Sequence, residues 1–330
     1  MSLSKQRKYR SDPTTGFGSS SANTGGRFYR KDGRVNVDRR GLKFFDRFSW
    51  YHTMLAIPRW QFWLELCGIY VFINLIFAYI YYLIGVEHLV GVDPDNELSA
   101  FAEAFFFSAQ TFTTVGYGRI SPAGFWASAV AAFEAFLGVL SFALASGLFY
   151  GRFAKPIANV YFSNVGLFAP YKDGKAFMFR MVPYKNNNLT DAEVKLTLAM
   201  RIPQENGDVR NEFYPLEVEF TRINVLVLNW TVVHYINADS PFYGLTLNQL
   251  EEAKAEVLVF FKAYDEVFAS TVIARTSYTA DEFIYNAKFK PMYQSSMTGD
   301  VTVLHIDRLN DYNLLSPATQ HADLDKAVSE

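Results

Sequence analysis

The sequence TTVGYG occupies residues 113–118, between two long apolar segments and directly after a run at residues 99–110 that is typical of a short helix. Its two glycines reach backbone conformations that residues with a Cβ avoid, so the carbonyl groups of residues 114–117 can all point toward one axis. Four chains around that axis would stack these oxygens into rings that replace the water shell of a dehydrated potassium ion. We therefore interpret the stretch as a potassium-selectivity filter. The expected K⁺-binding residues are Thr114, Val115, Gly116 and Tyr117, with the Thr114 hydroxyl at the inner end and Gly118 closing the stretch.

Charge is distributed unevenly along the chain, although the 330 residues sum to a formal net charge of −2. Residues 1–49 carry twelve Lys and Arg against four Asp, whereas residues 86–98 carry four acidic residues and no Lys or Arg. Cytoplasmic segments of membrane proteins have an excess of Lys and Arg. The pattern predicts a multi-pass protein of the cell (inner) membrane with its N-terminus in the cytoplasm. Because we expect two spans, we expect the C-terminus there too.

Two apolar segments predict membrane-spanning helices at residues 61–84 and 125–150. The first would measure about 36 Å as a helix, which is enough to cross a bilayer. Residues 99–110 are too short to cross, and non-helical backbone at membrane depth survives only where protein or a water-filled path encloses it. This order predicts a re-entrant pore helix followed by the filter. Large apolar residues at helical spacing in residues 44–57 predict an interfacial helix.

From residue 157 onward the pattern changes to short segments rich in β-branched residues, most of which alternate apolar with polar side chains. This pattern predicts an antiparallel β-sandwich on the cytoplasmic side of the membrane. The expected strands lie at residues 194–200, 216–220, 225–233, 257–261, 272–276 and 301–306. The expected domains are a flexible basic segment (1–43), a pore domain with its interfacial helix (44–156) and the β-sandwich (157–330).

Four residues of the second span carry the functional hypotheses for that helix. Glu134 is its only acidic residue, and facing lipid would cost it about 2.5–3.5 kcal/mol. It is expected either to face a water-filled cavity, where four carboxylates would concentrate cations, or to be a buried partner of the pore helix, hydrogen-bonded near Thr113 or Thr114. Gly138, near the middle, is expected to act as a hinge. Phe142 and Tyr150 are candidate gates because a ring of aromatic side chains can dewet a narrow pore; the alternative for both is packing against lipid.

Several motifs make the chain resemble the inward-rectifier potassium channels, and Val115 together with the short RISP exit at residues 119–122 resembles their prokaryotic branch. Those motifs are PRW (58–60), RFAKP (152–156), NWTVVH (229–234), DSPFYG (239–244) and ARTSY (274–278). The resemblance implies a homotetramer with two membrane helices per subunit and K⁺ as the conducted ion. It also implies that the interfacial helix is a slide helix and that a cytoplasmic immunoglobulin-like β-sandwich extends the ion path.

The resemblance also bears on gating. Arg59, Arg152 and Lys155 cluster at the expected inner membrane face, where ordinary anchoring explains such a cluster. The family instead binds anionic lipids such as phosphoinositides there, which implies gating at the inner helix bundle by lipid and by the cytoplasmic domain. Phe142 falls where strongly rectifying members carry an acidic residue, which argues against strong rectification by polyamines.

Three alternatives stay open at the level of the sequence. A nucleotide- or calcium-gated channel would need a Rossmann-type domain, whereas residues 157–330 contain strand patterns and no GxGxxG. A non-selective cation pore is disfavoured by Tyr117 in the filter. A membrane-anchored sensory or binding protein would use the β-domain alone and would leave the filter sequence unexplained. We expect no enzymatic activity, since the sequence has no nucleophile elbow, zinc motif or phosphate loop, and no nucleic-acid partner.

Overall fold

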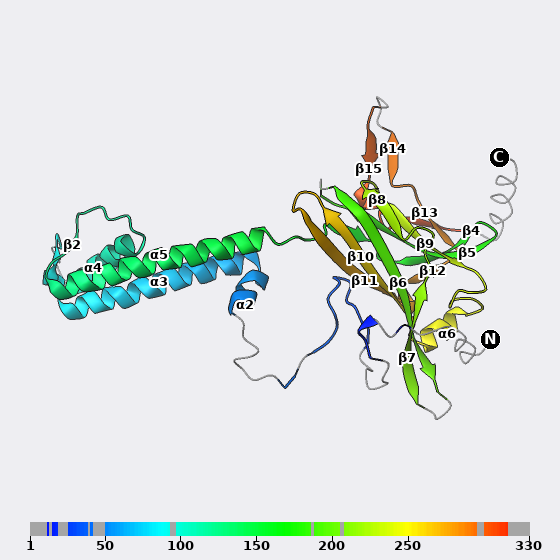
Figure 1. Ribbon diagram of the computed structural model, residues 1–330, viewed down its shortest axis with the longest axis horizontal. Helices are drawn as coiled ribbons and strands as arrows, with labels where there is room; N and C mark the ends of the chain where they lie inside the picture. The colour runs from blue at the N-terminus through cyan, green and yellow to red at the C-terminus, as the bar shows by residue number, and fades with distance from the viewer. Residues whose placement is uncertain are drawn as a thin grey trace. The chain divides into compact units, whose positions relative to one another are not determined.

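The computed structural model describes residues 12, 15–18, 26–38, 40–41, 50–92, 97–185, 188–204, 208–295 and 300–315. The chain divides into two compact units (Figure 1). The helical unit is Arg39–Lys155, and the β unit joins Met1–Asp38 to Pro156–Glu330. This division differs from the expected one at the N-terminus, because residues 1–38 group with the β unit instead of standing apart as a segment at residues 1–43.

The helical unit is built from two long apolar helices and two shorter ones: α2 (Trp50–Ala56), α3 (Arg59–Ile84), α4 (Glu97–Phe112) and α5 (Phe125–Phe153). With 26 and 29 residues, α3 and α5 are long and apolar enough to cross a membrane. They confirm the two expected long apolar helices, apart from small shifts at their ends. The expected short helix before the filter is α4, which packs against both long helices. Only α2 represents the expected interfacial helix, because residues 44–49 lie outside the described residues.

Aromatic and small side chains form the core of the helical unit. The ring of Tyr81 in α3 lies edge-on to that of Phe107 in α4, with 5.0 Å between the ring centroids. Ala78 and Ala104 are completely buried, and such small side chains let membrane helices approach closely. A second, smaller cluster joins α2, α3 and α5 through Met54, Phe62 and Leu148. At the other end of the long helices, a short turn at Val86–His88 leads into β1 (Leu89–Val90), which pairs with β2 (Ser121–Pro122).

The β unit contains two five-stranded sheets. One has the order β11–β10–β6–β7, with β8 also paired to β6; the other has the order β12–β4–β5–β3, with β9 also paired to β5. The strand bounds are β3 (Val160–Phe162), β4 (Gly166–Tyr171), β5 (Gly174–Pro183), β6 (Leu189–Pro203), β7 (Val209–Leu216), β8 (Arg222–Leu226), β9 (Trp230–Ile236), β10 (Glu256–Asp265), β11 (Ser270–Thr279) and β12 (Phe283–Tyr285). Shorter elements are α6 (Leu247–Glu252), the pair β13 (Ala287–Phe289) and β16 (Tyr312–Leu314), and the pair β14 (Tyr293–Ser295) and β15 (Thr302–Leu304).

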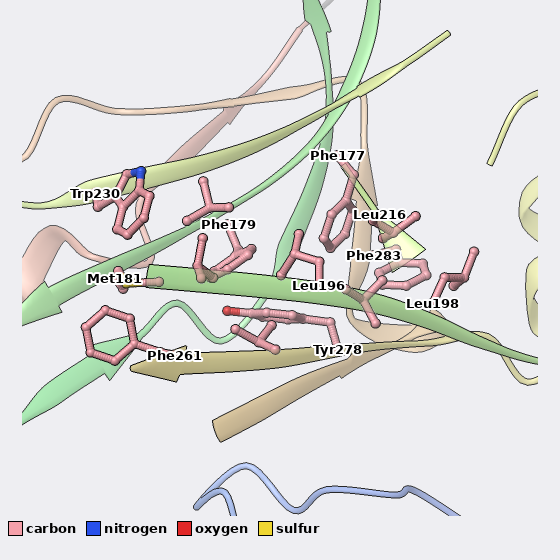
Figure 2. Close-up of a cluster of buried hydrophobic side chains, with 14 of the residues drawn as sticks. Phe177, Phe179, Met181, Leu196, Leu198, Leu216, Trp230, Phe261, Tyr278 and Phe283 are labelled. Carbon is pink, nitrogen blue, oxygen red and sulfur yellow. The ribbon is translucent and has the colours of Figure 1, made fainter. Parts of the chain in front are cut away.

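Side chains from both sheets share one apolar core (Figure 2). In β6, buried residues alternate with more exposed ones from Ala192 to Leu198, as the two-residue period of a strand requires when one face is covered. Phe177 and Phe179 of β5 and Phe261 of β10 are completely buried in this core. A β-sandwich follows from such packing, since each sheet buries its apolar face against the other.

Three expected strands are confirmed, because residues 194–200, 257–261 and 272–276 lie within β6, β10 and β11. The expected strand at 216–220 is wrong, since β7 ends at Leu216. The expected strand at 225–233 is interrupted between β8 and β9, and that at 301–306 shortens to β15 before a 3₁₀ turn. Pairing is antiparallel except between β4 and β12, which run parallel.

Residues 26–38, which we call the N-terminal strap, pack on the β unit instead of forming the expected mobile linker. The Arg27 guanidinium donates to both carboxylate oxygens of Glu282, each at 2.9 Å. The backbone N–H of Phe28 donates to the buried Glu256 carboxylate at 2.8 Å. These partners lie more than 200 positions away in the sequence, so the Gly- and Ser-rich composition around the strap could not reveal them.

Candidate functional site

The backbone of the filter stretch alternates in handedness. The angle φ is positive at Thr114 (58°), Gly116 (53°) and Gly118 (80°), and it is negative at the two residues between them. In an extended strand, successive carbonyls point to opposite sides; a positive φ at every second residue reverses that alternation and gathers the carbonyls on one side. Positive φ is an outlier for a β-branched residue such as Thr114 and costs about 1–3 kcal/mol. The surrounding structure must therefore hold this conformation in place.

The start of the expected filter is hydrogen-bonded to the last turn of α4. The N–H groups of Val115 and Gly116 both donate to the carbonyl oxygen of Gln110, at 3.0 and 3.3 Å, and the N–H of Thr114 donates to Thr111 at 3.0 Å. The last carbonyls of a helix have no partner within the helix, so these bonds satisfy them and orient the loop. The C-terminal end of α4, which carries a partial negative charge, thus meets the filter where a cation would lie.

The outer end of the filter is held by an ion pair and by close backbone packing. Arg119, directly after Gly118, pairs with Glu103 of α4. The next residue, Ile120, is buried, and a Cβ on Gly91 would overlap the carbonyl oxygen of Arg119. Contacts at both ends therefore fix the loop to α4 and to the turn before it. Within this single chain, the side chains of Val115 and Tyr117 remain 52% and 80% exposed.

Glu134 lies at the junction of the three longest helices. Its side chain is completely buried; the Tyr81 hydroxyl of α3 donates to it at 2.7 Å, and the Ser108 hydroxyl of α4 contacts its other oxygen. Ser108 also lies 2.9 Å from the amide oxygen of Asn74 in α3. Of the two arrangements expected for Glu134, this geometry is the buried partner of the pore helix. The partners are Tyr81 and Ser108, whereas the sequence suggested the threonines of the filter.

Gly138 lies where α5 crosses the end of α4. A Cβ at this position would overlap the carbonyl oxygen of Phe112, the last residue of α4. Glycine is therefore required for the close approach of the two helices, a reason that sequence reasoning missed when it proposed a hinge. The helix α5 runs from Phe125 to Phe153 through this position.

The two candidate gate residues, Phe142 and Tyr150, lie in the C-terminal half of α5. Each is 77% exposed in the single chain. Phe142 lines an open cavity of about 690 Å³, together with Thr113 and Thr114 at the start of the filter and apolar residues of α3. The cavity thus connects the expected inner end of the filter to the side chain expected to close the path. Tyr150 lies two helical turns further along α5.

The three basic residues expected to bind lipid lie in different environments. Arg59, at the start of α3, and Lys155, after α5, are exposed. Arg152 is half-buried and donates to two backbone carbonyls at the end of α2, those of Met54 at 3.0 Å and Ile57 at 2.6 Å. Its guanidinium therefore holds two secondary-structure elements together, a role that nothing in the sequence signalled.

Comparisons with known proteins agree on one family. Residues 160–327 match the family model described as the inward rectifier potassium channel C-terminal domain, and residues 69–155 match the model described as ion channel. The inward rectifier potassium channel Kirbac3.1 of Paramagnetospirillum magnetotacticum is 32% identical over 277 residues, which cover 83% of this chain and 91% of that protein. The G protein-activated inward rectifier potassium channel 4 of Mus musculus, like that of Rattus norvegicus, is 28% identical over 294 residues, which cover 81% of this chain and 68% of that protein.

The close approach at Gly138 predicts that Gly138→Ala is strongly destabilising. The added methyl group would have to displace the end of α4, and such overpacking costs about 1–3 kcal/mol or more. We expect a lower unfolding temperature of the purified protein in detergent. The matched control is Gly147→Ala on the same helix, where an added Cβ meets nothing within 4 Å. Equal unfolding temperatures for the two variants would contradict the packing role.

The bond from Tyr81 to Glu134 predicts a second effect on stability. Tyr81→Phe removes the donor and leaves a buried carboxylate oxygen without it, which costs about 1–3 kcal/mol. The measurement is again thermal unfolding in detergent. Tyr79→Phe, on the same helix and 55% exposed, serves as the control and should unfold like the wild type. A Tyr81→Phe protein as stable as this control would show that the bond contributes nothing.

Proposed function

We propose that this chain, which belongs to the inward rectifier potassium channel family and to its prokaryotic KirBac-type branch, conducts K⁺ passively through a filter formed by residues 114–118 of four identical subunits. The family identifies it as a potassium channel of the membrane and not as an enzyme. The observation that carries the proposed filter is the positive φ at every second residue from Thr114 to Gly118. Neutral carbonyl oxygens arranged in this way suit K⁺, because they can replace its hydration shell.

The surfaces of α3 and α5 that are exposed in the single chain support a fourfold assembly. One loop supplies only one wall of an ion path, so several copies must surround the axis. In the most apolar 18-residue stretch of each of the helices α3 and α5, only 22% is buried. Phe142 and Tyr150 of α5 are largely exposed. In the proposed homotetramer, part of these surfaces meets neighbouring subunits, part meets lipid, and the filter loops meet at the axis.

We place gating at the cytoplasmic half of α5. Phe142 lies on the cavity next to Thr114, and four phenylalanine side chains at this height would form a ring that excludes water when the path is narrow. Tyr150 would form a second ring about two helical turns closer to the C-terminal end of α5. Gly138 remains a proposed hinge, although its packing against Phe112 restricts bending to the part of α5 that follows it. Neutral Phe142 gives polyamines no carboxylate to bind, so strong rectification is not expected.

The proposed topology places α3 and α5 across the cell membrane, with both termini and the β unit in the cytoplasm. Basic residues near the cytoplasmic ends of the two helices support this orientation. Anionic lipid, such as a phosphoinositide, is the proposed regulator at Arg59, Arg152 and Lys155. The exposed Arg59 and Lys155 are free to approach a headgroup, and each such charge contributes about 1 kcal/mol near an anionic surface.

The proposed filter predicts that Gly116→Ala abolishes potassium flux. An alanine at φ 53° is strained, and relaxation of the backbone would turn carbonyls away from the axis. The assay is K⁺ uptake into liposomes that contain the purified protein, with Na⁺ as the competing ion. Gly68→Ala, where an added Cβ meets nothing within 4 Å, should conduct like the wild type. Selective K⁺ flux through the Gly116→Ala protein would contradict the filter, and equal fluxes of K⁺ and Na⁺ through the wild type would contradict selectivity.

The proposed gate predicts that Phe142→Ala raises K⁺ flux under conditions in which the wild type is mostly closed. Without the four phenyl rings of Phe142, the ion path at this height stays hydrated even when it is narrow. Phe133→Ala provides the control, because its position nine residues earlier points to the opposite side of α5. Closed-state flux as low in Phe142→Ala as in the wild type would place the gate elsewhere, with Tyr150 the next position to substitute.

A further inference from the structure

We propose that Glu134 keeps its proton and acts as a hydrogen-bond donor, so that a neutral carboxylic acid, and not a carboxylate, joins α5 to α4. Glu134 belongs to a group of four polar side chains, which we call the inter-helix network; the others are Asn74 and Tyr81 of α3 and Ser108 of α4. Each of the four is at most 1% exposed in the single chain. Buried polar atoms need hydrogen-bond partners, and these four side chains have to supply them largely to one another.

The backbone of α3 fixes the orientation of the Asn74 amide. The amide nitrogen donates to the carbonyl oxygen of Tyr70, at 2.7 Å. A carbonyl oxygen can only accept a hydrogen bond, so the nitrogen of the amide, and not its oxygen, has to face Tyr70. The amide oxygen of Asn74 therefore faces α4, where it lies 2.9 Å from the hydroxyl oxygen of Ser108.

The Ser108 hydroxyl has one proton and meets two oxygen atoms. The amide oxygen of Asn74 can only accept, so the Ser108 proton is needed there. The other neighbour of the hydroxyl is a carboxyl oxygen of Glu134. An ionised Glu134 has no proton to donate, and its oxygen would face the Ser108 oxygen with no proton between them. Turning the Ser108 proton toward Glu134 would instead leave the amide oxygen of Asn74 buried without a donor.

A protonated Glu134 gives every bond of the inter-helix network one donor and one acceptor. The Tyr81 hydroxyl donates at 2.7 Å to the other carboxyl oxygen, which is then the C=O oxygen of the acid. Glu134 donates to Ser108, and Ser108 donates to Asn74. The Asn74 amide completes the series at the backbone of α3. The hydrogen bonds therefore run in one direction, from α5 through α4 to α3.

The surroundings of Glu134 supply no positive charge that would stabilise a carboxylate. Between Arg59 and Arg152, the only Lys or Arg in the sequence is Arg119, and it pairs with Glu103. Among the described residues, the hydrogen-bond partners of Glu134 are two neutral hydroxyl groups. An isolated buried carboxylate is far more costly than a neutral group whose hydrogen bonds are made. Burial therefore favours the same protonated form as the number of available protons.

The inter-helix network lies next to the part of α4 that holds the proposed filter. Ser108 comes two residues before Gln110, whose carbonyl oxygen accepts the N–H groups of Val115 and Gly116. Glu134 is thus a positioning residue for the end of α4, and as a neutral acid it brings no charge to the ion path. This effect on conduction rests on the proposed function, whereas the protonation of Glu134 does not.

Infrared spectroscopy detects the proton directly, because a carboxylic acid has a C=O stretching band that a carboxylate lacks. The spectrum of the full-length Glu134→Gln protein is subtracted from that of the wild type, both in detergent at neutral pH. Other buried acidic side chains, such as Glu256, are present in both proteins and cancel. Glutamine is the matched substitution, since its amide can donate to Ser108 and accept from Tyr81. We expect a carboxylic-acid band in the difference spectrum.

Tyr81→Phe tests the same band and leaves Glu134 in place, so it decides the question even if Glu134→Gln does not fold. Removing the Tyr81 donor should shift the band to higher frequency, because that hydrogen bond no longer weakens the C=O bond of the acid. Tyr79→Phe, at a position that is 55% exposed on the same helix, is the control and should leave the band unchanged.

A carboxylate band that is lost in Glu134→Gln would overturn the proposal, and so would the absence of any carboxylic-acid band that Tyr81→Phe shifts. Glu134→Gln should also conduct K⁺ like the wild type, because its amide makes both bonds. Reduced K⁺ flux in a Glu134→Gln protein that unfolds at the wild-type temperature would show that a charge at this position serves conduction, and it would overturn the proposal as well. Wild-type protein without K⁺ flux would defeat the proposed function alone, since the infrared bands are measured independently of conduction.

Discussion

The arrangement of the helical unit depends on holding residues 114–118 in an irregular backbone conformation in which φ is positive at every second residue. Such a stretch has no hydrogen-bonding ladder of its own, and at membrane depth it survives only within protein or along water. The positive φ at Thr114 adds strain that local contacts must offset. Those contacts are visible at both ends of the filter, where Gln110 accepts two backbone N–H groups and Arg119 pairs with Glu103. The helix α4 is thus the support on which the filter is built.

Two further contacts keep α4 itself in place, and both come from α5. Glu134 is bonded to Ser108 of α4 and to Tyr81 of α3, and Gly138 allows α5 to touch the last carbonyl of α4. A buried carboxylate is costly to desolvate, and removing one hydrogen-bond donor from it costs about 1–3 kcal/mol. Its value here is positional, because its contacts with Tyr81 and Ser108 join α3, α4 and α5 at one buried point. A carboxylate used in this way, with both oxygens bonded inside the subunit, is less able to attract cations from a cavity.

Local patterns in the sequence were sufficient for the two long apolar helices, for the short helix before residues 113–118 and for the strands that alternate regularly, such as the part of β6 around Leu196. They failed where the reason for a residue lies in a partner far along the chain. Gly138 looks only like a hinge in a helix pattern, and its close packing on the carbonyl of Phe112 could not be predicted from that pattern. Arg152 looks like one more basic residue at a membrane face, until its contacts with α2 are known. The N-terminal strap has the composition of a linker, yet Glu256 and Glu282 order it from the other end of the sequence. The expected strand after Leu216 was wrong for a related reason, because alternation does not say where a neighbouring strand ends.

In the proposed function, the positions along α5 explain how one helix would serve both permeation and gating. Glu134 and Gly138 fasten the first half of α5 to α4. Phe142 and Tyr150, each 77% exposed in the single chain, lie on the half that follows Gly138. Arg152 then ties its cytoplasmic end to α2, about 27 Å from Glu134 along the helix axis. A helix that is fixed at one end and displaced at the other moves most near the displaced end. In the proposed function, residues 114–118 would therefore keep their geometry while the proposed rings at Phe142 and Tyr150 change their spacing, because the fastening at Gly138 separates the two. The absence of a side chain at Gly138 serves this separation, since the close packing on Phe112 that it allows makes the first half of α5 part of the support of residues 113–118.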